Sequence, residues 1–347
     1  MFKFLGNRDV SHLHRSSYSA NLPLAIKNII LPYINNIKVR SEADFYGASH
    51  NISEFVGVAI KNTLSSWSHG WGTAALKFPE QIAWDQAWKL HRLVRTNKVK
   101  NFLSNNGIKN VVAVGLPIIY TENKHIHRSN GSILFMPAHS LSYVDIDPQI
   151  DEMVSFAINM RSAGKYVCFC IHDDCLRHGK IIPLLDSYHL DWFVGSSIYD
   201  SNSLQRMRNI FSFFEVVASN TIGSHFVYSQ LFGAKFFFHE PYFEFKSEQF
   251  LKSPVLGKKN ELRHYLMDQS SYKIVKEKYP SYFQGYANAV CDQVFAEIEC
   301  GVPDHVEPKE LVGLLGWSLK DQVLYSLPYY SSKMVNKVKA KITRKSS

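Results

Sequence analysis

Apolar and polar stretches alternate along the first third of the chain in short helix and strand patterns. The apolar spacing predicts helices over residues 22–37 and 98–106, a strand within residues 55–66, and a buried strand over residues 111–115. Gly107 follows the second helix pattern, where a left-handed residue commonly ends a helix. This part of the chain therefore combines both kinds of element.

A more regular alternation begins near residue 133. The predicted strands cover residues 133–137, 166–171, 191–194, 214–218 and 235–238, and helix patterns over residues 148–163, 203–211 and 222–232 lie between them. Strand–helix–strand repetition at this spacing is typical of a parallel sheet with helices on both faces. The polar segment 120–132 separates the two alternations and has the composition of a linker.

Together these patterns predict an α/β fold made of two Rossmann-like domains with a C-terminal helical extension. We expect an N-terminal domain over residues 1–125, a C-terminal domain over residues 132–325 and a basic tail over residues 326–347. Helical periodicity at residues 261–275, 283–300 and 308–319 supplies the extension. Open parallel sheets bind ligands beyond the carboxyl ends of their strands, so we expect a site in a cleft between the domains.

The composition favours a folded protein with anionic partners. Apolar residues make up 46% of the 347 residues, and the net charge is +9 although only 20% of the residues are charged. Such a charge favours nucleotides, nucleic acids or an anionic membrane as partners. We expect no nucleic-acid binding, because no recognition motif is present and the basic residues cluster mainly in the tail.

Neither the cysteines nor the acidic pairs predict a metal site. The five cysteines have no paired CxxC spacing, so we expect reduced thiols in the core. Asp145 and Asp147 have the spacing of a metal-binding DxD motif, but Pro148 follows them and indicates a helix start instead. No apolar run reaches the ~18 residues of a membrane span and no signal-peptide core is present, so we expect a cytoplasmic protein.

Polar side chains follow each predicted strand of the second half, at its carboxyl end. In chain order they are His139 and Ser140, then His172, then Ser196, then the loop 219–225, and finally Glu240. Because the carboxyl ends of parallel strands meet at one edge of a sheet, we expect these residues to gather in one site.

The loop after the fourth of these strands has the features of an anion site. Ser219, Thr221 and Ser224 supply hydroxyl groups, and Gly223 and His225 lie where the next helix begins. Backbone N–H groups at a helix start point outward, and the helix dipole adds partial positive charge there. The loop therefore predicts a ligand that carries phosphate.

The first half contributes one comparable loop, from Trp67 to Gly72. In it, His69 is flanked by small residues and glycines that permit a tight turn and the close approach of a ligand. Histidine titrates near neutral pH, so His69 is the candidate base for an attacking hydroxyl. Asp85 or Asp44 is the alternative base, and a tryptophan-rich packing loop would explain His69 without catalysis.

These motifs, spread over residues 55–245, resemble GT-B-type bacterial glycosyltransferases of the sialyltransferase and Kdo-transferase kind. In those enzymes a histidine on one strand and a Ser/Thr pair at a later helix start hold the donor, and His172 and the loop 219–225 match these features in order. The loop at His69 resembles the His-Gly loop of teichoic-acid polyol-phosphate transferases, whose histidine acts as base. More loosely, segments 92–96, 115–117 and 136–140 resemble bacterial capsule and O-antigen biosynthesis proteins.

Two positions differ from the pattern of the family. Asp173 follows His172 where the family has the proline of a His-Pro motif. Asn220 separates Ser219 from Thr221 where the family has adjacent hydroxyl residues. These differences concern the base and the sugar of the donor rather than the fold.

The resemblance implies a glycosyltransferase that needs no metal and no cofactor. It would move a sugar from a nucleotide-sugar donor, with CMP-linked sugars among the candidates, to a glycan or lipid-linked acceptor of capsule or lipopolysaccharide. The catalytic candidates are His69, Asp85 and His139. The candidate donor-binding residues are Ser140, His172, Ser196, Ser219, Thr221, Gly223, Ser224, His225 and Glu240.

Other interpretations of the same residues stay open. The chain could transfer a polyol phosphate, as the teichoic-acid enzymes do, or serve as a non-catalytic scaffold with a GT-B fold. A retaining double displacement would need a carboxylate nucleophile, for which Asp173, Asp174 or Glu240 are available. In the tail, residues 333–345 alternate apolar residues with lysines and contain no acid. This pattern fits either an amphipathic helix at the inner face of the cytoplasmic membrane or a solubilising disordered tail.

Overall fold

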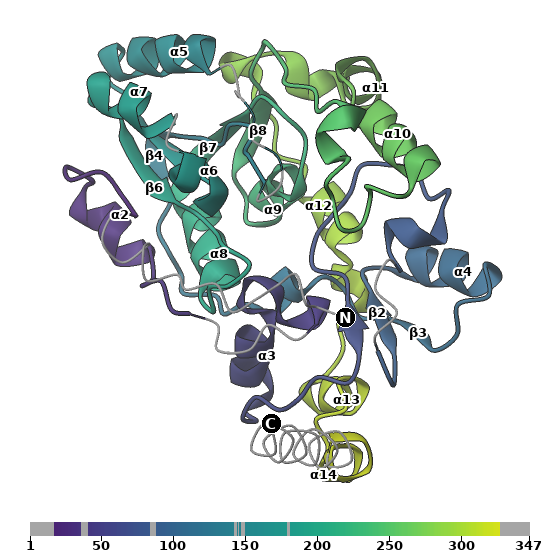
Figure 1. The fold of residues 1–347 in the computed structure, drawn as a ribbon. Helices are drawn as coiled ribbons and strands as arrows, with labels where there is room; N and C mark the ends of the chain where they lie inside the picture. The colour runs from purple at the N-terminus through teal and green to yellow at the C-terminus, as the bar shows by residue number, and fades with distance from the viewer. Residues whose placement is uncertain are drawn as a thin grey trace, which may run out of the picture.

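The computed structural model describes residues 17–35, 41–83, 88–141, 144, 146, 150–178 and 181–326 of the chain. In this part of the chain the strands form two parallel sheets, one of three strands and one of five, and helices pack around both (Figure 1). The α/β prediction is therefore confirmed. Parallel sheets joined by helices are compatible with Rossmann-like folds.

The small sheet lies in the first third of the chain. Its strands pair in parallel in chain order: β1 (Ser66–Trp67), β2 (Arg92–Val94) and β3 (Val111–Ala113). Helix α4 (Asn97–Asn105) joins β2 to β3, and the side chain of Thr96 caps it by accepting a hydrogen bond from the Val99 N–H. The 3-10 segment η1 (Glu42–Gly47) packs against β1 and leads into α3 (Ala48–Val56).

The large sheet follows the second alternation of the sequence. Its strands are β4 (Ser129–Phe135), β5 (Tyr166–Ile171), β6 (Asp191–Val194), β7 (Phe214–Ser219) and β8 (Lys235–Phe238). They are parallel and lie in the order β6-β5-β4-β7-β8. The winding direction thus reverses between β4 and β7, and such reversal points are where open α/β sheets bind ligands.

The strands of the large sheet are apolar because both faces of the sheet are covered. Phe135 on β4, Phe169 on β5 and Phe193 on β6 are fully buried, and the rings of Phe135 and Phe169 stack 5.0 Å apart. The helices between the strands are α5 (Asp151–Ser162), α6 (Asp173–His178), α7 (Ile181–Ser187), α8 (Ser203–Phe213) and α9 (Ser224–Leu231).

The predicted helical extension is present, as a series of short helices. They are α10 (Asn260–Gln269), α11 (Tyr272–Lys278), α12 (Gln293–Cys300), α13 (Pro308–Leu314) and α14 (Leu319–Asp321). Among the described residues, no helix combines the length and the apolar character needed to cross a bilayer. Residues 327–347 of the basic tail, including residues 333–345, lie outside the described residues.

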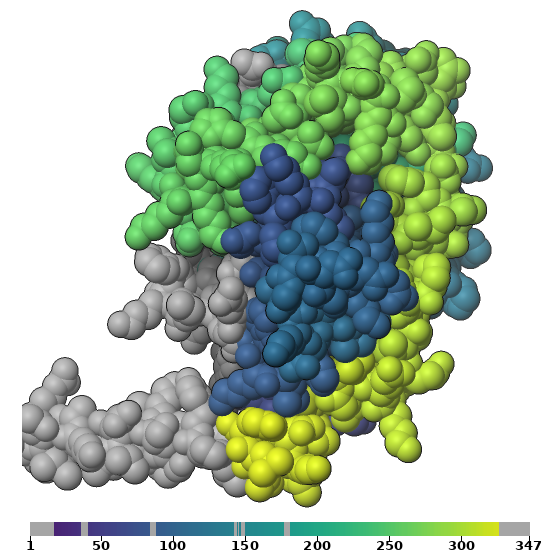
Figure 2. All heavy atoms as spheres, turned by 90° about the vertical axis from the view of Figure 1, so that its right-hand side faces the viewer, coloured from purple at the N-terminus to yellow at the C-terminus, as the bar shows by residue number. Residues whose placement is uncertain are grey.

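Segments from both ends of the described chain cross between the sheets. Helix α2 (Leu24–Ile29) packs on α8, and the N–H of Ser19 donates to the carbonyl of Trp192 over 2.8 Å, so this segment belongs to the large sheet. In the opposite direction, α13 packs on α3 beside the small sheet. Figure 2 shows the C-terminal residues in yellow flanking the blue residues of the small sheet. The domain boundaries near residues 125 and 132 stay a prediction.

Several predicted elements differ from those observed. The helix over residues 22–37 is only Leu24–Ile29, and the predicted strand at 55–66 contributes only Ser66, because α3 extends to Val56 and ends at Gly57 in a left-handed conformation. The helix over 261–275 is interrupted between α10 and α11, and the one over 283–300 begins at Gln293. Helices α3, α6 and α7 were not predicted, since α3 has few apolar residues, α6 follows a strand directly, and α7 is short and contains Pro183.

Candidate functional site

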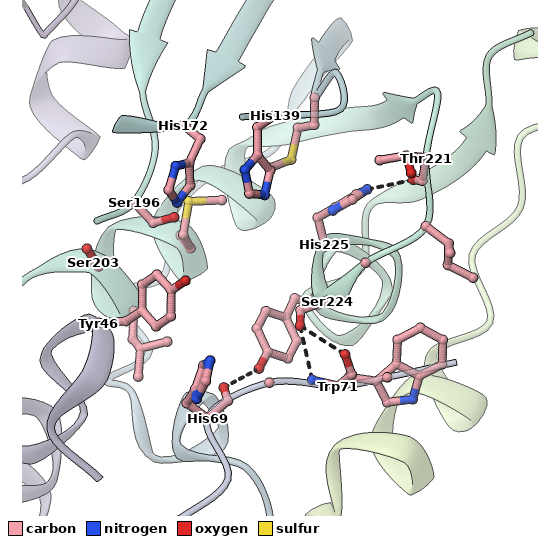
Figure 3. A pocket seen from close by; sticks show the side chains of 18 of the residues that line it. Tyr46, His69, Trp71, His139, His172, Ser196, Ser203, Thr221, Ser224 and His225 are labelled. Atoms are coloured by element: carbon pink, nitrogen blue, oxygen red, sulfur yellow. Dashed lines mark hydrogen bonds between the residues drawn. The ribbon is translucent and has the colours of Figure 1, made fainter. Parts of the chain in front are cut away.

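A cavity of about 450 Å³ lies between the carboxyl edges of the two sheets. Residues after β1 form one wall, and residues after β4, β5, β6 and β7 form the other (Figure 3). Most of the predicted site residues line it: His69, His139, His172, Ser196, Thr221, Gly223, Ser224 and His225. The structure thus brings several of the predicted strand-end residues together at the carboxyl edge of the large sheet, whereas Ser140, Ser219 and Glu240 do not line the cavity.

His69 stands on the small-sheet wall of the cavity, directly after β1. Its ring nitrogen Nδ1 lies 3.0 Å from Oε1 of Glu42, a carboxylate on η1 that is only 4% exposed. The other oxygen of Glu42 lies 3.1 Å from the guanidinium of the fully buried Arg92. The structure thus places a histidine–carboxylate pair, backed by an arginine, at the edge of the cavity.

The loop that carries His69 is tied to the opposite wall. The Trp71 N–H donates to Oγ of Ser224 over 3.0 Å, and the hydroxyl of Tyr228 donates to the His69 carbonyl over 3.0 Å. Both partners belong to α9, and Figure 3 shows the contact between Ser224 and Trp71. A Cβ on Gly70 would come within 3.1 Å of the Ser224 hydroxyl oxygen, so a glycine allows the two walls to meet closely.

Helix α9 begins at the cavity, as the loop pattern predicted. Gly223 precedes its first turn in an extended conformation, and Gly223, Ser224 and His225 line the cavity. The first N–H groups of a helix have no partner within the helix, so this turn presents donors and the positive end of the dipole to a ligand. The arrangement fits an anion.

Ser219 and Asn220 shape the loop rather than line the cavity. The Ser219 hydroxyl accepts from the Thr221 N–H over 3.2 Å and donates to the Thr221 carbonyl over 3.0 Å, which closes a local turn. The side chain of Asn220 accepts from the Ala138 N–H over 2.8 Å and so joins the loops after β7 and β4. Asn220, which separates Ser219 from Thr221, therefore has a structural role here.

The histidines of the large-sheet wall have defined protonation. The rings of His139 and His172 stack with centroids 4.2 Å apart. His139 Nδ1 donates to the Ser140 carbonyl and His225 Nε2 donates to the Thr221 carbonyl, because a carbonyl oxygen only accepts. Burial lowers the pKa of His139, and burial lowers the pKa of His225 to about 4. Both rings are therefore neutral at pH 7.

His172 has the opposite arrangement of its ring nitrogens. Its Nδ1 accepts from the Asp174 N–H over 3.2 Å, so in the neutral ring the proton is on Nε2.

None of the described residues that line the cavity is a lysine or an arginine. The partial positive charge that these residues offer to an anion thus comes from the start of α9, and the neutral ring of His172 adds an N–H donor.

The remaining predicted residues lie elsewhere. Ser140 is buried and accepts from the Ile146 N–H over 3.2 Å. Glu240 is exposed and contacts Tyr272 and Lys276 of α11, and the Tyr272 hydroxyl is the main cause that lowers the pKa of its carboxyl group. Asp85 lies outside the described residues, together with Asp145 and Asp147.

The alternative carboxylates take structural positions. Asp44 is buried and caps the start of η1 by accepting from the Ser41 N–H over 3.2 Å. Asp173 is buried and accepts from the Ser197 hydroxyl over 2.9 Å. Asp174 lies beside His172, with Oδ2 3.6 Å from the ring nitrogen Nδ1. Within the described residues, no cluster of three or more histidine, cysteine or acidic side chains could hold a metal ion.

Sequence reasoning missed several residues of the site, among them Glu42, Tyr46 and Tyr228. Glu42 and Tyr46 line the cavity from η1, more than twenty residues before His69, and no local pattern connects them to it. Tyr228 could have been found, because it follows Ser224 by four positions and so shares its face of α9.

No protein-family model and no curated protein sequence matches this chain.

Proposed function

We propose that the protein is a glycosyltransferase of the GT-B type, which transfers a sugar from a nucleotide-sugar donor to a hydroxyl group of a glycan or lipid-linked acceptor. The observation that carries the proposal is the pairing across one cavity of His69, bound to Glu42, and the start of α9. One feature suits a proton acceptor and the other suits a phosphate.

The donor would bind mainly to the large sheet, at the reversal point between β4 and β7. Its phosphate would lie at the first turn of α9, within reach of Thr221 and Ser224. His139 and His172 line the same wall and offer ring nitrogens of opposite character, an acceptor and a donor. The negative charge on the departing nucleotide would thus meet the N–H donors at the start of α9 and on His172, which are already oriented.

His69 would take the proton of the acceptor hydroxyl as that oxygen attacks the anomeric carbon. The bond between this carbon and the phosphate oxygen breaks, and the nucleotide leaves with the electron pair. His69 lies on the small-sheet wall of the same cavity, so an acceptor hydroxyl beside it would reach a donor bound at the start of α9. A single, inverting displacement needs only this base and no carboxylate nucleophile.

Binding of nucleotides is the first test. We expect one member of a panel of CMP, CDP, UDP and GDP to raise the melting temperature, because a ligand at 100 times its Kd stabilises the folded state by about 2.7 kcal/mol. No stabilisation by any of them at millimolar concentration would contradict the proposal. CDP-glycerol and CDP-ribitol in the same panel identify a polyol-phosphate transferase, which the same helix start would suit.

Replacement of His69 by alanine separates catalysis from binding. Loss of a general base lowers kcat by about 10²- to 10⁴-fold. The melting shift caused by the nucleotide should stay, because the start of α9 is unchanged. Turnover is measured as nucleotide release from the donor identified by the panel. Unchanged turnover in His69→Ala would rule out its role as base, and a shift without any turnover in the wild type would favour the scaffold interpretation.

A further inference from the structure

We propose that Glu42 is a positioning residue that holds His69 in the tautomer with the proton on Nδ1. The unprotonated Nε2 then receives the proton of the acceptor hydroxyl. The catalytic consequence rests on the proposed function, whereas the tautomer can be tested without any reaction.

The contact between Glu42 and His69 determines where the ring proton lies. Nδ1 of His69 is 3.0 Å from Oε1 of Glu42, and an ionised carboxylate only accepts hydrogen bonds. A neutral imidazole has a single ring proton, so its place on Nδ1 leaves a lone pair on Nε2. When Nε2 takes up a proton, the adjacent carboxylate stabilises the positive charge of the ring.

Arg92 prevents the Glu42 carboxylate from changing its orientation. The guanidinium donates to Oε2 of Glu42 over 3.1 Å and to the Ser66 hydroxyl over 2.5 Å, and it also contacts the Ile82 carbonyl. Arg92 is fully buried, and a guanidinium has donors only. The two oxygens of Glu42 are thus assigned to different partners, with Oε2 on the arginine and Oε1 on the histidine.

Aromatic neighbours restrict the ring of His69 further. The ring of Phe45 meets it edge-on with centroids 5.0 Å apart, and Tyr46 lies at 5.4 Å. Both come from η1, the same segment as Glu42, and the Tyr46 N–H donates to the Ile198 carbonyl over 3.2 Å. The orientation of His69 is therefore set by η1, which is itself attached to the segment after β6.

Glu42→Gln is the decisive variant, because it keeps the shape of the side chain and reverses its hydrogen bonding. Arg92 only donates, so it retains the amide oxygen and turns the amide NH₂ group toward His69. An NH₂ group donates to Nδ1, which moves the ring proton to Nε2. The nitrogen that faces the acceptor then has no lone pair, although the fold is preserved.

The tautomer is read by nitrogen-15 NMR of protein labelled at histidine, with the His69 signals identified by their loss in His69→Ala. We expect protonated Nδ1 in the wild type and protonated Nε2 in Glu42→Gln. We expect kcat to fall by about 10²- to 10⁴-fold, as for loss of the base, while the affinity for the nucleotide is unchanged. Glu54→Gln, an exposed carboxylate on α3, is the matched control and should change neither quantity.

The outcomes separate the two proposals. A proton on Nε2 in the wild type, or an unchanged tautomer in Glu42→Gln, overturns the role of Glu42. A tautomer that changes without any loss of kcat supports the contact but contradicts His69 as base. If the ring proton moves to Nε2 in Glu42→Gln but the protein binds no nucleotide, Glu42 is still a positioning residue. That result contradicts only the proposal that the protein is a glycosyltransferase.

Discussion

Burial decides what a single histidine contributes to this cavity. His225 is held neutral, and its Nε2 proton is committed to the Thr221 carbonyl, so its Nδ1 is the nitrogen that can accept. His69 is more open, with 29% of its side chain exposed, and it has a carboxylate partner. Both residues follow small polar residues in the sequence, and only their surroundings make one structural and the other a candidate base.

The depressed pKa of His225 predicts a loss of stability in acid. The unfolded residue ionises near pH 6.5, whereas the folded residue does so near about 4. As the pH falls through this window, the unfolded chain takes up a proton that the folded chain does not. Stability therefore decreases from about pH 6.5 to about pH 4, by about 3 kcal/mol for this one group. Burial of His139 acts in the same direction.

Urea unfolding at pH 7.5, 6.0 and 5.0 checks this expectation. His225→Gln keeps a donor for the Thr221 carbonyl but cannot titrate, so its free energy of unfolding should depend less on pH. His264→Gln, at an exposed position on α10, serves as the control. Equal pH dependence in wild type and His225→Gln would show that His225 is not buried as the structure describes.

At the scale of elements, η1 transmits the packing of the large sheet to the small-sheet wall of the cavity. Gly47 ends η1 with a φ of 74°, and a Cβ there would lie 1.9 Å from the Ser201 carbonyl oxygen. Gly57 ends α3 with a similar φ of 67°, but a Cβ there would meet nothing within 4 Å. Both glycines thus have a left-handed backbone, but only at Gly47 would a side chain collide with another part of the chain.

Gly47→Ala should therefore be more harmful than Gly57→Ala. Each places an alanine in the left-handed region, at a cost of about 1–3 kcal/mol. Only Gly47→Ala also forces η1 away from residue 201, which displaces Glu42 and should lower kcat. Thermal unfolding and nucleotide release from the donor measure the two effects. Equal losses of stability and of kcat in both variants would contradict the coupling through η1.

Helices and strands were predicted well where strands and helices alternate regularly along the chain, as they do in the large sheet. The strands of the large sheet were found to within a few residues, because buried parallel strands are continuous apolar runs between turn residues. Prediction failed at α3, where apolar residues at the end of a helix and the start of a loop looked like one strand. Local patterns do not distinguish these cases, since tertiary packing decides between them.

At the scale of the whole molecule, exposed apolar side chains lie near the end of the described residues, and basic sequence follows them in the chain. Leu319 is 77% exposed, and Val323 and Leu324 beside it are exposed as well. The lysines of residues 333–345 follow closely in the chain. We propose that this end contacts an anionic membrane, where a lipid-linked acceptor would be found.

Removal of residues 327–347 tests the membrane contact. We expect the full chain to float with vesicles that contain phosphatidylglycerol, and to bind them less as salt increases, because basic residues are attracted to an anionic surface. The shortened protein should lose this binding and keep its melting shift with nucleotide. Vesicles of phosphatidylcholine alone are the control. Equal flotation of both proteins would favour a tail that only solubilises.

The sequence by itself determined the α/β fold class, the polar residues at the strand ends and the start of a helix at the loop 219–225. These features are local, because an apolar run, a turn residue and a helix start depend on near neighbours in the chain. Only the tertiary structure brought Glu42 and Arg92 to His69, placed Ser219 and Glu240 outside the cavity, and attached the loop at Trp71 to Ser224. Contacts between residues far apart in the chain follow from how the two sheets pack, and no local pattern records that packing.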